Sequence, residues 1–203
     1  MRLILASSSP RRADLLRAAG YAFETIAADV DESIRAGESP SGYVRRLAAD
    51  KSATAMETLK AGAASNPAAP PFTAADVVVL GADTTVVVDG EILGKPRDDE
   101  EGRQMLRLLS DKTHEVLTGI SLRQGAYEVG RVETTTVSFR PLTDEDISWY
   151  VASGEGRDKA GGYAIQGLAS RFIPSIAGSY SNVVGLPVVC LDELLRSLLA
   201  SGR

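Results

Sequence analysis

Short apolar runs alternate along this chain with apolar residues at helical spacing. The runs predict strands at Leu3–Ala6, Phe23–Ile26, Asp76–Asp83, Thr85–Val88, Val116–Leu122 and Val129–Phe139. Helices are predicted from Pro10 to Gly20, from Ser39-Pro40 to about Leu59, over Asp98–Leu109, from Thr143 to Val151, and from Gly185-Leu186-Pro187 to Leu199. Proline is favoured in the first helical turn and glycine just past the last, and Asp89-Gly90 between apolar runs predicts a hairpin.

One stretch departs from this pattern. Ala61 to Ala75 is rich in alanine, proline and small polar residues, which predicts a surface loop rather than a domain boundary. With 203 residues and 21.4 kDa, the chain is long enough for a sizeable core, and we expect one domain over residues 1–203.

Charge and composition narrow the function. A net charge of −5 and a pI near 5.0 argue against binding of nucleic acid or of a membrane surface, both of which favour a basic face. A single cysteine, Cys190, excludes an intrachain disulfide and a multi-cysteine zinc site, and its apolar neighbours favour burial. The single histidine, His114, favours a structural role over a catalytic one. Neither a signal-peptide pattern nor a bilayer-length apolar run is visible, so we expect a cytoplasmic protein.

The first strand-to-helix connection carries candidate chemistry. Ser7-Ser8-Ser9-Pro10-Arg11-Arg12 lies between the first strand and the first helix. Helix N-termini attract anions, serine hydroxyls donate hydrogen bonds, and guanidinium groups match phosphate oxygens. The segment is therefore a candidate phosphate cradle, with Ser7, Ser9, Arg11 and Arg12 as its donors. The alternative is an ordinary turn with a serine N-cap and two solvated arginines.

Carboxylates occur at two places where they could take part in catalysis or bind a metal ion. Asp83 stands at the predicted end of the most apolar strand, where a carboxylate is costly unless it is paired, hydrogen-bonded or bound to a metal. Asp29-Val30-Asp31-Glu32-Ser33 is an acidic turn that offers oxygen ligands for magnesium or manganese. A structural hydrogen-bonding role for Asp83 and a solvated loop around Glu32 are the competing interpretations.

Two lysines are further candidates. Lys51 interrupts an apolar helical stripe made of Val44, Leu47, Ala48 and Ala55, so it either projects into a polar cleft or extends along the surface to reach water. Lys95 is presented by Leu93-Gly94-Lys95-Pro96, and taken alone it resembles a solvated loop lysine. In the glycine-rich stretch Asp158–Gly167, Gln166 carries donors and acceptors suited to a base edge, although an exposed glutamine in a turn is the simpler interpretation.

Together these stretches resemble the Maf family of nucleoside triphosphate pyrophosphatases over essentially the whole length. The matching pieces, in order, are Ser7-Ser8-Ser9-Pro10-Arg11-Arg12, Asp31-Glu32-Ser33, Arg46-Leu47-Ala48 with Lys51, Gly81-Ala82-Asp83-Thr84, Gly94-Lys95-Pro96, Lys159-Ala160-Gly161-Gly162-Tyr163 with Ile165-Gln166-Gly167, and Gly185-Leu186-Pro187. The resemblance implies a mixed α/β fold, with a central sheet flanked by helices in two lobes around a cleft and an inosine triphosphatase-like architecture. It also implies a homodimer.

The resemblance further implies an activity: hydrolysis of a nucleoside triphosphate to a monophosphate and pyrophosphate with a divalent metal, Mg²⁺ or Mn²⁺. Ala82-Asp83-Thr84 and Gln166 are similar to the branch that acts on dTTP and UTP, in which the residues matching Arg11, Thr84 and Gln166 govern substrate choice. Modified pyrimidine nucleotides are further candidate substrates. The alternatives are the 7-methyl-GTP branch of the same family and a nucleotide-sensing regulator of septum formation.

On this interpretation we expect Asp83 to be the proton acceptor and Lys51 and Lys95 to be catalytic cations. Glu32 and Asp83 are the expected metal ligands. Ser7, Ser9, Arg11 and Arg12 are expected to bind phosphate, and Thr84 and Gln166 to bind the base. The central expectation is that these residues, which are distant in sequence, converge on a single pocket.

Overall fold

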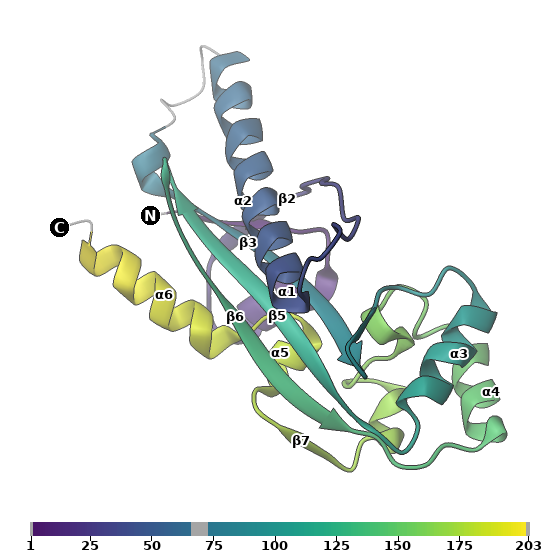
Figure 1. The fold of residues 1–203 in the computed structure, drawn as a ribbon. Coiled ribbons are helices and arrows are strands. Elements are labelled where there is room, and N and C mark those ends of the chain that lie inside the picture. Colours follow the sequence, from purple (N-terminus) through teal and green to yellow (C-terminus); the bar gives the residue numbers. More distant parts are fainter. Residues whose placement is uncertain (1, 66–72, 202–203) are drawn as a thin grey trace. The chain divides into compact units, whose positions relative to one another are not determined.

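The fold was analysed in a computed structural model that describes residues 2–65 and 73–201. Its strands are β1 (Arg2–Ala6), β2 (Phe23–Ile26), β3 (Val77–Val88), β4 (Glu91–Leu93), β5 (Thr113–Gln124), β6 (Tyr127–Ser138) and β7 (Ser175–Ala177) (Figure 1). Its α-helices are α1 (Pro10–Ala18), α2 (Pro40–Ser65), α3 (Asp99–Leu109), α4 (Asp144–Ala152), α5 (Tyr180–Val184) and α6 (Val188–Ser201). Short 3₁₀ turns, η1 (Ala74–Asp76), η2 (Ala160–Gly162) and η3 (Leu168–Phe172), complete the set.

The strands form a mixed sheet in the order β2-β1-β3-β5-β6-β7, with β4 added to β3. β1 is parallel to both β2 and β3, whereas β4 is antiparallel to β3 and β7 is antiparallel to β6. The mixed α/β fold expected from the resemblance is therefore confirmed. The inosine triphosphatase-like architecture and the single domain over residues 1–203 stay predictions.

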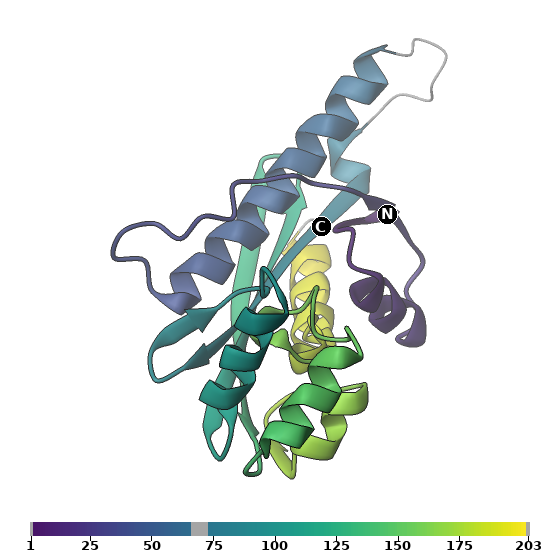
Figure 2. The same cartoon turned by 90° about the vertical axis from the view of Figure 1, so that its right-hand side faces the viewer.

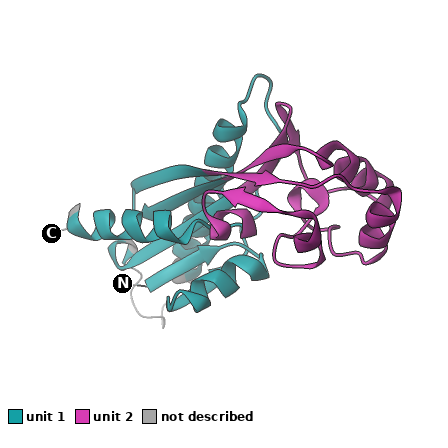
Figure 3. Ribbon diagram, turned by 90° about the horizontal axis from the view of Figure 1, so that it is seen from below, with its two compact units in different colours: residues 1–83, 118–133, 185–203 teal, residues 84–117, 134–184 magenta. Residues whose placement is uncertain are grey.

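The chain divides into two compact units, shown in teal and magenta in Figure 3. Unit 1 comprises residues 1–83, 118–133 and 185–203, and unit 2 comprises residues 84–117 and 134–184. The division falls within β3, directly after Asp83.

The core of unit 1 follows from strand alternation, because successive side chains of a strand point to opposite faces. Ile4 and Ala6 of β1 pack with Ala55 and Met56 of α2. The alternate residues of β1 and β3 pack with α1 and α6, in a cluster that includes Leu3, Leu5, Val78, Leu80, Leu16, Leu191 and Leu195. One face of this part of the sheet is thus covered by α2, blue in Figures 1 and 2, and the other by α1 and α6, which are purple and yellow.

Unit 2 has its own core. Residues of β3, α3, β5, β6 and α4 pack around an aromatic group formed by Phe139, Tyr150, Tyr163 and Phe172. His114 is buried beside this group, with its Nε2 2.7 Å from the hydroxyl of Tyr163. The predicted structural role of His114 agrees with this position.

Three expectations need correction. α2 continues to Ser65, beyond the predicted end near Leu59, because its alanine-rich end favours helix. The expected loop Ala61–Ala75 therefore begins in helix and ends in the 3₁₀ turn at Ala74–Asp76, and its residues 66–72 lie outside the described residues. Asp83 is not at the end of a strand, because β3 runs unbroken to Val88 and pairs with β4 beyond it.

Among the residues that the structure describes, no helix combines the length and the hydropathy needed to cross a bilayer. Cys190 is buried, as predicted.

Candidate active site

The register of β1 on β3 explains why distant residues meet in unit 1. The parallel ladder ends at Ala6 opposite Gly81, so the chain leaves β1 at Ser7 close to where β3 reaches Asp83. In open α/β sheets, ligands bind where parallel strands end and their connections begin. The Ser7–Arg12 connection and the Asp83 carboxylate therefore belong to the same edge of unit 1.

Hydrogen bonds hold the Ser7–Arg12 segment in shape. Ser9 is the N-cap residue of α1, and its N–H donates to Ser7 Oγ at 3.1 Å. The guanidinium of Arg12 donates to Ser7 Oγ at 3.2 Å and to the backbone oxygen of Gly185 at 2.8 Å. Arg12 is thus anchored to its own turn and to the Gly185-Leu186-Pro187 motif, which argues against a loosely solvated arginine.

Four charges are close enough to influence one another. The pKa of Arg12 is lowered, chiefly because burial disfavours its charge. The negative charges of Asp83 and Glu32 oppose that shift, whereas the positive charge of Arg11 adds to it. A triphosphate placed here would meet the cationic groups of Arg11 and Arg12 beside two carboxylates.

Lys51 lies between the two candidate carboxylates. Its Nζ donates to Asp83 Oδ1 and to Glu32 Oε1, in each case at 2.7 Å. The side chains of Lys51 and Asp83 are only 10% and 12% exposed, whereas that of Glu32 is 48% exposed. The costly lysine on the apolar stripe and the costly aspartate on the buried strand therefore neutralise each other, and Lys51 does not extend along the surface to water.

A glycine brings α2 close enough for this contact. A Cβ at Gly81, two residues before Asp83, would overlap the backbone oxygen of Ala48 and lie 2.8 Å from the backbone nitrogen of Ser52. Only glycine lets the helix approach the strand so closely. The backbone of α2 on either side of Lys51 is thereby set directly against β3.

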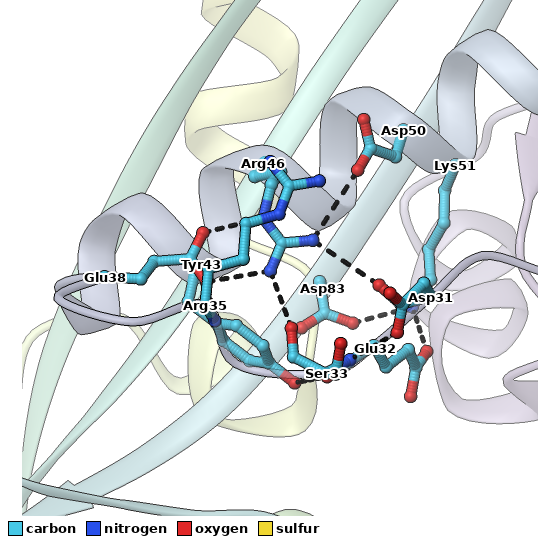
Figure 4. Close-up of polar contacts among 10 residues, drawn as sticks. All are labelled: Asp31, Glu32, Ser33, Arg35, Glu38, Tyr43, Arg46, Asp50, Lys51 and Asp83. Atoms are coloured by element: carbon cyan, nitrogen blue, oxygen red, sulfur yellow. Dashed lines mark hydrogen bonds and ion pairs between the residues drawn. The ribbon is translucent and has the colours of Figure 1, made fainter.

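Glu32 comes from the acidic turn between β2 and α2, which has neither helix nor strand of its own. This turn is held to α2 by Tyr43, which no sequence pattern singled out, and by Arg46, which belongs to a family-like motif but had no predicted role (Figure 4). Tyr43 donates its hydroxyl to the backbone oxygen of Glu32 at 3.0 Å, and Arg46 donates to the backbone oxygen of Ser33 at 3.0 Å. The signal available in the sequence was the spacing of Tyr43, Arg46 and Asp50, which places them along one helix face.

The donor set fits a hard divalent cation. In the described parts of the chain no three histidine, cysteine, aspartate or glutamate side chains form a metal-binding group. Glu32 and Asp83 nevertheless direct one carboxylate oxygen each to a common cation, the ammonium of Lys51. Magnesium usually takes one or two carboxylates together with substrate phosphates, so this pair suffices for it.

The remaining predicted residues lie in unit 2. Thr84 follows Asp83 directly in β3. Lys95 is exposed, and the carbonyl of the neighbouring Gly94 accepts a hydrogen bond from Gly161 N at 3.0 Å, so two of the family-like motifs meet within this unit. Gln166 is exposed in a turn closed by Gly167 N and Ala164 O at 3.1 Å. The convergence of Lys95 and Gln166 with the Lys51–Asp83 pair stays a prediction.

Comparison with known proteins gives a consistent picture. Residues 2–198 match the sequence model of the family described as Maf-like protein. A protein of Anaeromyxobacter sp. strain Fw109-5 named dTTP/UTP pyrophosphatase is 48% identical over 200 residues, covering 96% of this chain and 88% of that protein. Its namesake in Escherichia coli O157:H7 is also 48% identical, covering 98% of this chain and 93% of its own. Among solved structures, the Staphylococcus aureus Ham1 protein matches with a TM-score of 0.45 and 12% identity over both whole chains.

Proposed function

Because the chain belongs to the Maf family, we propose that it is a pyrophosphatase that hydrolyses dTTP and UTP to the nucleoside monophosphate and pyrophosphate. The observation that carries the proposal is the Lys51 ammonium held between Asp83 and Glu32 next to the Ser7–Arg12 connection. Cations for a polyphosphate and carboxylates for water and metal are thus collected in unit 1 at the edge where β1 ends.

The first task of this site is to bind the triphosphate. Arg11 and Arg12 supply guanidinium groups that match phosphate oxygens, and Ser7 and Ser9 add neutral donors at the start of α1. Lys51 is a mobile point charge on a long stem. When phosphate oxygens arrive, its ammonium exchanges carboxylate partners for phosphate oxygens, which frees Asp83 and Glu32 for the reaction. Lys95 is proposed to add a further cation.

The second task is to activate water. Asp83 accepts a proton from the attacking water as the water oxygen bonds to the α-phosphorus. The bond between the α-phosphorus and the α–β bridging oxygen breaks, and that oxygen leaves with pyrophosphate. A divalent metal held by Glu32 and Asp83 would neutralise charge that develops on the leaving group. The burial of Asp83 keeps bulk water away from the carboxylate that holds the proton.

We assign selection of the substrate's nucleobase to Arg11, Thr84 and Gln166. The amide of Gln166 and the hydroxyl of Thr84 are proposed to bond to the polar edge of uracil or thymine. Cytosine reverses part of that donor and acceptor pattern, so CTP cannot satisfy both side chains and is a poorer substrate.

A nucleotide panel tests the activity. Pyrophosphate release from dTTP, UTP, dCTP, dATP and 7-methyl-GTP is measured while Mg²⁺ or Mn²⁺ is titrated. We expect dTTP and UTP to be hydrolysed fastest, and hydrolysis to vanish when the metal is chelated. A clear preference for 7-methyl-GTP would move the chain to the other branch, and nucleotide binding without turnover would favour the sensor of septum formation.

The catalytic assignment is tested separately. General bases contribute about 10²–10⁴-fold, so Asp83→Asn is expected to lower turnover by that order while dTTP binding is largely retained. Near-wild-type turnover of this variant removes Asp83 from the role. A homodimer and a cytoplasmic location remain part of the proposal, to be checked by light scattering of the purified protein and by cell fractionation.

A further inference from the structure

Arg46 makes four hydrogen bonds around the acidic turn. Its Nε donates to Glu38 Oε1 at 2.6 Å and its Nη2 to Glu38 Oε2 at 2.8 Å, a two-pronged pair whose side chains are only 13% and 11% exposed. Two backbone carbonyls also accept from it, Ser33 O at 3.0 Å and Asp31 O at 3.4 Å. These two carbonyls flank Glu32 on either side (Figure 4).

All three nitrogens of this guanidinium donate hydrogen bonds within the protein. Nε is taken by Glu38, Nη2 by Glu38 and Ser33, and Nη1 by Asp31, with Asp50 Oδ2 a further 3.7 Å from Nη1. To bind a phosphate with two of its nitrogens, Arg46 would have to release contacts that hold its own turn. Its geometry therefore suits a residue that supports another rather than one that touches substrate.

Tyr43, one helical turn before Arg46, completes the attachment. Its hydroxyl donates to the backbone oxygen of Glu32 itself, and its ring lies under the Arg46 guanidinium at 5.7 Å. Three successive carbonyls, those of Asp31, Glu32 and Ser33, are thus all held from α2. The same helix carries Lys51, whose Nζ donates to the Glu32 carboxylate.

We propose that Arg46, locked by Glu38 and assisted by Tyr43, is a positioning residue that orders residues 31–33 and thereby holds the Glu32 carboxylate where a metal–triphosphate complex is bound. This role rests on the proposed function, but nothing in that function assigns it. Without the Arg46–Glu38 pair, residues 31–33 lose the two carbonyl contacts that Arg46 makes, and they have no helix or strand of their own to keep the Glu32 backbone in place. The Glu32 carboxylate then leaves its position beside Asp83.

Four variants separate this role from its alternatives. Arg46→Lys keeps the charge but loses the two-pronged geometry, and Glu38→Gln keeps Arg46 but removes the carboxylate that orients it. Tyr43→Phe removes one carbonyl contact and preserves the ring. Asp50→Asn is the matched control, because Asp50 faces the same guanidinium from 3.7 Å and its side chain is 44% exposed.

Two measurements apply to each variant. Hydrogen exchange of the peptide that covers residues 27–39 reports order in the turn without reference to activity. Binding of Mn²⁺ in the presence of a non-hydrolysable dTTP analogue, followed by electron paramagnetic resonance, reports the placement of Glu32. We expect faster exchange and about 10–100-fold weaker Mn²⁺ binding in Arg46→Lys and Glu38→Gln, a smaller effect of the same kind in Tyr43→Phe, and wild-type behaviour in Asp50→Asn.

Kinetics distinguish a positioning role from a purely structural one, because only the positioning role changes the metal requirement and leaves kcat at saturating metal largely intact. At saturating metal, kcat of Arg46→Lys is expected to recover toward the wild-type value while the half-saturating metal concentration stays raised. A loss of thermal stability with an unchanged metal requirement would overturn the proposal, as would unchanged exchange of residues 27–39.

If wild type hydrolyses dTTP and Glu32→Gln does not, while Arg46→Lys and Glu38→Gln behave as wild type, the positioning role is wrong and the proposed function stands. If wild type hydrolyses no nucleotide, the proposed function fails, and the exchange data still decide whether Arg46 orders the turn.

Discussion

Lys51 provides the sharpest test of how the site is held together, through the substitution Lys51→Met. Methionine keeps the length of the side chain and most of its packing but removes the ammonium between Asp83 Oδ1 and Glu32 Oε1. Removing one partner of a buried ion pair typically costs about 3–5 kcal/mol, because the other charge is left buried and unpaired. The cost here comes mainly from Asp83, since Glu32 is half exposed and remains hydrated. We therefore expect a loss of about 3 kcal/mol, at the lower end of that range.

For a chain of this length, about 3 kcal/mol corresponds to a fall in Tm of roughly 6–12 °C. Thermal and urea unfolding, each followed by two probes, measure the change and show whether the two units unfold together. The matched control is Lys60→Met on the same helix, where the ion pair with Glu57 is exposed and contributes at most about 1 kcal/mol. The double variant Lys51→Met/Asp83→Asn leaves no unpaired buried charge. It should be more stable than Lys51→Met alone.

The reasoning fails if Lys51→Met costs no more than Lys60→Met. It also fails if the double variant is destabilised by the sum of its two single changes, since additive effects would mean that Lys51 and Asp83 do not interact.

Two further predictions concern packing and pH. Gly81→Ala should both destabilise the protein and lower dTTP hydrolysis, because the added methyl group meets the backbone oxygen of Ala48 and pushes α2, with Lys51, away from β3. Unfolding and dTTP hydrolysis measured on the same preparation test this prediction. Full activity would contradict it. Burial lowers the pKa of His114 to about 4 from an ordinary value of 6.5. Between those values the unfolded chain binds a proton that the folded chain does not, so the stability from neutral His114 is complete above about pH 6.5 and is lost as the pH falls toward 4, by on the order of 2–3 kcal/mol. Urea unfolding across that range should show a shallower pH dependence in His114→Gln, and identical slopes would refute the burial argument.

Local patterns predicted the elements of this fold well. Thr143, the predicted start of a helix, forms a capping box with Asp146 at the start of α4, and Asp89-Gly90 adopts the positive φ angles of a tight hairpin turn between β3 and β4. These features depend on residues within a few positions of each other, so the sequence alone contains the information. The extension of α2 to Ser65 was missed because the proline-containing stretch that follows was given too much weight.

The meeting of Lys51 with Asp83 depends on information that no local pattern holds. It requires the parallel register that ends at Ala6 and Gly81, and a glycine where the backbone of α2 lies against β3. The position of Asp83 in mid-strand was missed for a related reason: β4 takes over as a partner of β3 beyond the end of β1, so the strand continues past the carboxylate.

The pairing of Glu38 with Arg46 was not predicted, because a charged residue off the apolar stripe of a helix usually faces solvent and Glu38 lies outside α2. Arg46 and Glu38 are eight positions apart, and only the path of the acidic turn brings them together. The low exposure of both side chains and the carbonyl contacts of Arg46 distinguish this pair from the exposed pair of Arg17 and Asp14.

The central claim is that the cations and carboxylates collected at the end of β1 cleave a pyrimidine nucleoside triphosphate between its α- and β-phosphates. Phosphorus NMR of the products formed from dTTP tests it most directly, with wild type and Asp83→Asn compared at equal concentration. The account predicts dTMP and pyrophosphate in equal amounts from wild type and about 10²–10⁴-fold slower formation of both in the variant. Release of dTDP with inorganic phosphate, or equal rates for the two proteins, would contradict it.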